Sequence, residues 1–168
     1  MPYVSFHDHF PEVAERETRT VFILDDSPYD LPPGPYTLIE MYCNEPGCDC
    51  RRVFFCVVSP HRRHALAVVA YGWENRDFYE RWFGHYDPEE IDVLKGPALN
   101  LASPQSDLAP AIMDMIQCTV LQDELYVERL KTHYKMFREK IDKEGVPGPP
   151  RATASRKRRT KRRHKRKR

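Results

Sequence analysis

The spacing of the apolar residues changes half way along the chain, and this change constrains the fold most. In the first half, short apolar runs alternate with turn-rich segments, which is typical of β-strands. These runs are Val21–Leu24, Tyr36–Tyr42, Val53–Val58 and Ala65–Trp73. After residue 75 the apolar residues recur at steps of three and four, as in amphipathic helices. Strands followed by helices predict an α+β fold.

Short links between the apolar runs favour an antiparallel sheet of about four strands, packed against two or three C-terminal helices. Asn75, Ser106 and Asp123 each precede a helical pattern and are suitable N-caps. The third of these helices is expected to be the longest, and Gly145 ends it. We also expect a short helix over residues 11–19.

Composition divides the chain at the end of this last helix. Residues 1–145 suit a single α+β metal-binding domain, and residues 146–168 form a Pro/Gly linker followed by an Arg/Lys-rich tail. The tail is too charged to bury a core, so we expect it to be disordered in isolation.

Three cysteines lie within eight residues, at the tip of the hairpin predicted from the second and third apolar runs. Cys43, Cys48 and Cys50 surround a Pro-Gly turn, so one short loop presents three thiols to one ion. Zinc is the expected metal because it favours tetrahedral thiolate and imidazole ligands. A Cys-x4-Cys-x-Cys spacing is less common than paired Cys-x2-Cys knuckles.

A tetrahedral site needs a fourth ligand, and His133 on the long helix is our first choice. It borders the buried stripe of that helix, from which it can reach the hairpin. Cys56 lies six residues beyond Cys50 on a strand, about 20 Å away, and is expected in the core. The other candidates are His7, His9, His61 and His64.

Two alternatives remain for the cysteines. They are incidental to a turn, or they carry thiol chemistry, with Cys48 and Cys50 as a redox pair and Arg51 and Arg52 stabilising a thiolate. A variant of the thiol-chemistry interpretation is a zinc-dependent enzyme with an open coordination position. However, three anionic thiolates make zinc a poor Lewis acid. No phosphate-binding loop, dinucleotide fingerprint, zinc-protease motif or nucleophile elbow is present, so the sequence gives no positive indication of an enzyme.

The charges are strongly separated. Residues 151–168 hold 12 of the 27 Lys and Arg residues and no acid, whereas residues 1–150 carry 15 basic and 25 acidic residues. We expect the tail to bind RNA or DNA without sequence preference, through phosphate contacts that weaken with salt. The basic residues in its continuous run are Arg156, Lys157, Arg158, Arg159, Lys161, Arg162, Arg163, Lys165, Arg166, Lys167 and Arg168. An import signal, a solubilising role and contact with the acidic body are the other interpretations.

The location follows from what the sequence lacks. No early apolar run resembles a signal peptide, and no stretch approaches the roughly 20 apolar residues of a membrane span. The odd number of cysteines, five, agrees with a reducing compartment in which thiols stay free. We therefore expect a soluble cytoplasmic protein.

The string Tyr-Cys-x4-Cys-Asp-Cys-Arg-Arg-Val over Tyr42–Val53 resembles a string shared by an uncharacterised family of bacterial proteins. The helix start at Gln105–Ser106 and the segment Leu130–Tyr134 also resemble that family, so the resemblance covers residues 36–140. It implies that the cysteines and His133 lie in motif segments, and it implies no activity. The basic tail lies outside it.

Overall fold

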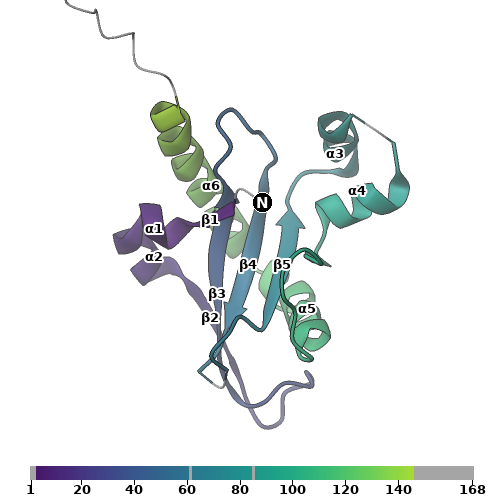
Figure 1. The fold of residues 1–168 in the computed structure, drawn as a ribbon. Coiled ribbons are helices and arrows are strands. Elements are labelled where there is room, and N and C mark those ends of the chain that lie inside the picture. The colour runs from purple at the N-terminus through teal and green to yellow at the C-terminus, as the bar shows by residue number, and fades with distance from the viewer. Residues whose placement is uncertain (1–2, 61, 85, 146–168) are drawn as a thin grey trace, which may run out of the picture.

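The computed structural model describes residues 3–60, 62–84 and 86–145 (Figure 1). Six strands form one antiparallel sheet in these ranges. They are β1 (Tyr3–Ser5), β2 (Arg19–Ile23), β3 (Gly34–Cys43), β4 (Arg52–Val58), β5 (Ala67–Gly72) and β6 (Ala98–Leu99). The helices are α1 (Phe6–His9), α2 (Pro11–Glu17), α3 (Arg76–Phe83), α4 (Pro88–Lys95), α5 (Ala109–Cys118) and α6 (Glu124–Gly145), and a 3₁₀ turn spans Val120–Gln122.

The strand order is β1-β3-β4-β5-β6, and β2 also pairs with β3. Both N-terminal strands lie along one edge of β3, where β1 pairs with residues 41–43 and β2 with residues 34–38. The α+β class and the short helix predicted over residues 11–19, which is α2, are therefore confirmed, but the strand number was underestimated and α1 was not predicted. The missed strands have only three and two residues, too few for a repeat to be visible in the sequence.

Side-chain caps explain where several helices begin. The Asn75 side chain accepts a hydrogen bond from the amide of Phe78 at 2.9 Å, and Gly84 ends α3 in the left-handed conformation with φ of +74°. Asp123 accepts from the amide of Tyr126 at 3.1 Å and caps α6. Helix α4 was not predicted, although Asp87 caps it and Pro88 occupies its first turn.

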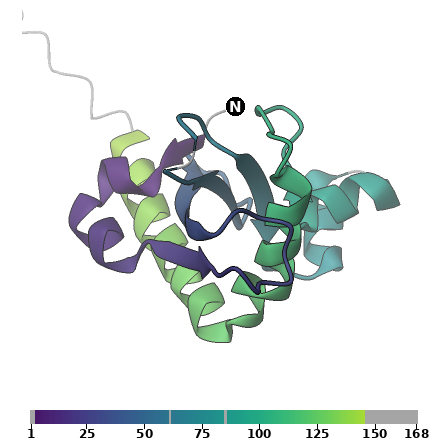
Figure 2. The same ribbon diagram turned by 90° about the horizontal axis from the view of Figure 1, so that it is seen from below.

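The main core lies between the sheet and helices α5 and α6, which cover the same face (Figures 1 and 2). Alternate residues of β3 point into this core, so Leu38 and Tyr42 are fully buried while Ile39 and Met41 are half-buried. Leu130 and Phe137 of α6 lie against them, as the helical spacing predicts. No helix in the described ranges has the length and apolar character needed to cross a membrane.

Candidate metal centre

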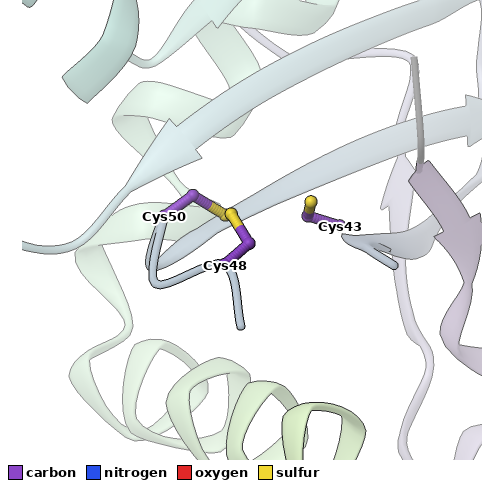
Figure 3. A group of neighbouring side chains, drawn as sticks. All are labelled: Cys43, Cys48 and Cys50. Atoms are coloured by element: carbon purple, nitrogen blue, oxygen red, sulfur yellow. The ribbon is translucent and has the colours of Figure 1, made fainter. Parts of the chain in front are cut away.

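The three cysteines meet at the β3–β4 connection. Cys43 is the last residue of β3, and Cys48 and Cys50 lie in the loop that leads into β4 (Figure 3). Their sulfur atoms all lie within 4.8 Å of one another, which makes them a group able to hold a metal ion. Cys43 and Cys50 are buried, whereas Cys48 is partly exposed. The prediction that the thiols cluster at a hairpin tip is confirmed.

The loop reverses direction through two positions with positive φ. Gly47 has a φ of +73°, which glycine adopts without strain, and the amide of Cys48 donates to the carbonyl of Glu45 at 3.2 Å to close the turn. Arg51 has a φ of +47°, which is uncommon for a residue with a side chain. The loop therefore brings Cys48 and Cys50 back toward the end of β3.

Contacts of both its side chain and its backbone hold Arg51 in this conformation. Its guanidinium forms ion pairs with Asp49 at 2.9 Å and Glu74 at 3.1 Å, and it lies 4.6 Å from the centre of the Phe78 ring. Its carbonyl accepts a hydrogen bond from the hydroxyl of Tyr79 at 2.9 Å. These contacts favour a structural role for Arg51 over an anion-binding one.

Helix α6 holds the other side of the loop. Arg138 donates to the carbonyl of Cys43 at 2.7 Å and to that of Glu45 at 2.9 Å. Asp142 pairs with Arg138 one turn away and accepts from the amide of Gly47 at 2.9 Å. The hydroxyl of Tyr134 accepts from the amide of Arg51 at 3.2 Å. We call Tyr134, Arg138 and Asp142 the loop clamp.

Cys43 is the most acidic of the three thiols. Its pKa falls to about 6, mainly because the Cys50 thiol donates a hydrogen bond to its sulfur. Burial raises the pKa of Cys43, but the Glu45 amide, the Cys48 thiol and the Arg138 charge lower it further. The pKa of Cys50 is raised by the same hydrogen bond and by burial. Burial, followed by the charge of Cys43, raises the pKa of Cys48. The Cys43 thiol therefore ionises before the other two.

Three backbone amides also lower the pKa values of the thiols, each from two residues further along the chain. The amide of Glu45 stabilises the Cys43 thiolate, and those of Cys50 and Arg52 do the same for Cys48 and Cys50. Amide hydrogen bonds favour the ionised form of a thiol, which is the form that binds metal. These amides add to the lowering of the pKa of Cys43, whereas they offset only part of the effects that raise the pKa values of Cys48 and Cys50.

His133, our first choice for the fourth ligand, does not join the cysteines. Its Nδ1 lies 2.7 Å from a carboxylate oxygen of Glu40 and its Nε2 lies 3.0 Å from one of Glu17. Both ring nitrogens are thus engaged, and the group of metal-ligating side chains contains the three cysteines without it. The reason is its position on α6: one residue turns a helix by 100°, so His133 faces β3 and α2 while its neighbour Tyr134 faces the loop.

The remaining candidates also lie elsewhere. Cys56 is half-buried and packs with Phe54 and Val68 in a small cluster separate from the main core. The His9 ring packs on Phe137 at 5.1 Å, and His64 is exposed. His61 and the tail residues proposed to bind nucleic acid lie outside the ranges that the structure describes.

Two sets of residues were missed from the sequence. The loop clamp carries a visible signal, since Tyr134, Arg138 and Asp142 recur every four residues and so line one face of α6. The carboxylates of Glu40 and Glu17 carry none, because nothing in a single sequence shows that they converge on His133.

Comparison of the chain with protein-family models, curated proteins and solved structures finds no match.

Proposed function

We propose that Cys43, Cys48 and Cys50 bind a zinc ion whose role is structural. The observation that carries this proposal is the convergence of three sulfur atoms within 4.8 Å. Around a tetrahedral zinc with bonds of about 2.3 Å, sulfur atoms lie about 3.8 Å apart. The cluster thus needs only a small contraction to close on the ion.

The chemistry of the ligands supports zinc and a structural role. Thiolates are soft ligands that zinc accepts readily, and the pKa of Cys43 is already lowered toward the ionised form that binds the metal. A zinc ion bound to three thiolates is a weak Lewis acid, so the site is poorly suited to activating water. The ion would join the end of β3 to the loop before β4.

Thiol chemistry is a second candidate, and the lowered pKa of Cys43 favours it. However, the thiols first assigned to a redox pair, Cys48 and Cys50, have raised pKa values. If a reactive thiol is present, the structure therefore favours Cys43 over those two. A redox function predicts a reactive thiol in the protein as isolated, whereas a zinc function predicts thiols that react only after chelation.

The test is elemental analysis of protein purified under reducing conditions, with thiol titration before and after chelation. We expect about one zinc per chain, lost in Cys48→Ser and retained in Cys118→Ser. Cys118 is the matched control because it is an exposed cysteine at the end of α5. Zinc absent from the wild-type chain, or retained equally by both variants, would reject the site.

We further propose that the tail binds nucleic acid through its phosphates. The support is its charge: 12 basic residues and no acid in residues 151–168, attached to a body with ten more acidic than basic residues. Binding of RNA and DNA of unrelated sequences should be similar and should weaken steeply with salt. Binding that survives deletion of residues 151–168 would move the interaction to the acidic body.

A further inference from the structure

Helices α3 and α4 lie side by side next to the β5 end of the sheet and extend outward from it as an arm (Figure 1). Between them lies an open cavity of about 420 Å³, lined by Phe83, Glu89, Glu90, Val93 and Leu94. We call it the arm groove. Phe83, Val93 and Leu94 are apolar, and Val93 is 56% exposed. Exposed apolar side chains gathered in a groove are typical of a contact surface.

The rim of the arm groove is acidic. Glu89 and Glu90 are exposed, and neither has an ion-pair partner within the ranges that the structure describes. The surrounding segment, residues 74–95, carries seven acidic and three basic residues. An apolar floor with an unneutralised acidic rim matches a ligand that is both apolar and positively charged.

The walls of the arm groove are already fixed. Arg76 of α3 donates to the carbonyl of Pro88 at 2.9 Å and pairs with Asp92 of α4. Tyr79 and Ile91 are fully buried and anchor α3 and α4, respectively. A ligand can therefore enter without first ordering the two helices, which lowers the entropic cost of binding.

We propose that the arm groove binds a segment of another protein in which a large apolar side chain is flanked by lysine or arginine. The apolar side chain lies against Val93 and Leu94, and the flanking cations face Glu89 and Glu90. The chain's own tail matches only half of this description: residues 151–168 supply the cations but contain no large apolar side chain. This proposal does not depend on the metal centre.

The test measures the anisotropy of short dye-labelled peptides titrated with the full-length chain. The probes are a lysine–leucine peptide, the same peptide with serine in place of leucine, a serine–leucine peptide without charge, and a peptide of residues 146–168. We expect saturable binding of the lysine–leucine peptide, and binding of the other three weaker by about tenfold or more.

Two variants place the binding in the arm groove. Val93→Ser removes apolar surface at an exposed position, and Glu89→Gln with Glu90→Gln removes the charge of the rim. Each change should weaken the binding of the lysine–leucine peptide about tenfold or more. The control is Asp114→Asn with Glu139→Gln, which removes the same charge from exposed positions on α5 and α6.

Three results would overturn the proposal. Equal binding of the lysine–serine and lysine–leucine peptides would reduce the interaction to charge attraction. An unchanged affinity in Val93→Ser would place the contact elsewhere. Tighter binding by the peptide of residues 146–168, with the same sensitivity to Val93→Ser, would make the tail of this chain the occupant.

Discussion

Replacing His133 with alanine tests the buried polar network that joins α6 to β3 and α2. The imidazole is 2% exposed, bridges Glu40 and Glu17 through its two nitrogens, and stacks on Phe6 with 4.4 Å between ring centres. Glu40 is also buried, and one of its carboxylate oxygens has no hydrogen-bond partner in the described part of the chain. Without His133, Glu40 still accepts a hydrogen bond from the hydroxyl of Tyr42, at 2.8 Å, but it loses its bond to the imidazole.

The cost of His133→Ala follows from that remaining carboxylate. Removing one member of a buried ion pair costs about 3–5 kcal/mol because the other charge is left without compensation. The Glu17 contact adds little, since its side chain is 35% exposed and screened by water. Domains unfold with about 5–15 kcal/mol, so the loss is a large fraction of the total and lowers the melting temperature by roughly 10 °C.

The loss of stability in His133→Ala should depend on pH, because the contacts of His133 change its pKa. Burial opposes the charge on His133, but hydrogen bonds and attraction from Glu40, and then from Glu17, outweigh it and raise its pKa. A raised pKa in the folded state stabilises the protein below the unfolded pKa, and this contribution is lost as the pH rises through the folded value. The difference between wild type and His133→Ala should therefore be largest in mild acid and shrink in alkali.

Urea unfolding of His133→Ala, Glu40→Gln and the double variant at several pH values measures these quantities. We expect a coupling energy of about 2 kcal/mol or more between the two sites, with the zinc content unchanged. A loss below about 1 kcal/mol, or a difference that grows with pH, would refute the charged network. Loss of zinc without unfolding would instead return His133 to the metal.

Two further substitutions test how the loop and the arm are held. Arg138→Met removes the hydrogen bonds to the carbonyls of Cys43 and Glu45; it should lower the unfolding free energy by about 2–3 kcal/mol and speed zinc loss to a chelator, and an unchanged rate would contradict the loop clamp. Gly72→Ala places a Cβ in steric conflict with the hydroxyl of the buried Tyr79, so we expect a loss of about 1–3 kcal/mol in urea unfolding. A neutral result would show that α3 is free to shift.

The sequence predicted those parts of the fold that local rules determine. Residue types that cap helices identified Asn75 and Asp123, and turn chemistry placed the cysteine loop between two strands. Asp87 and Pro88 carried the same kind of signal for α4, which was overlooked. Strands β1 and β6 gave no signal, because they exist through pairing with longer strands and have no pattern of their own.

The site was predictable only as far as the cysteines are close in sequence. Cys43, Cys48 and Cys50 are joined by one loop, so their convergence is a local property. The partner of His133 depends instead on which face of α6 meets β3, and a change of one residue in register exchanges His133 for Tyr134. The positions of the apolar residues in the sequence define the buried face of a helix only to within about one residue.

Because the loop clamp already holds the cysteine loop, a metal ion has less folding free energy to supply. In small zinc modules the ion supplies the folding free energy, because few other contacts hold the ligands. Here Arg138 and Asp142 bind the backbone of the loop, Tyr134 accepts a hydrogen bond from the amide of Arg51, and Cys43 and Cys50 are themselves buried in the main core. Chelation should therefore leave the sheet and α6 folded and raise the mobility of residues 43–50, because these protein contacts remain in place when the link between the three sulfurs is removed.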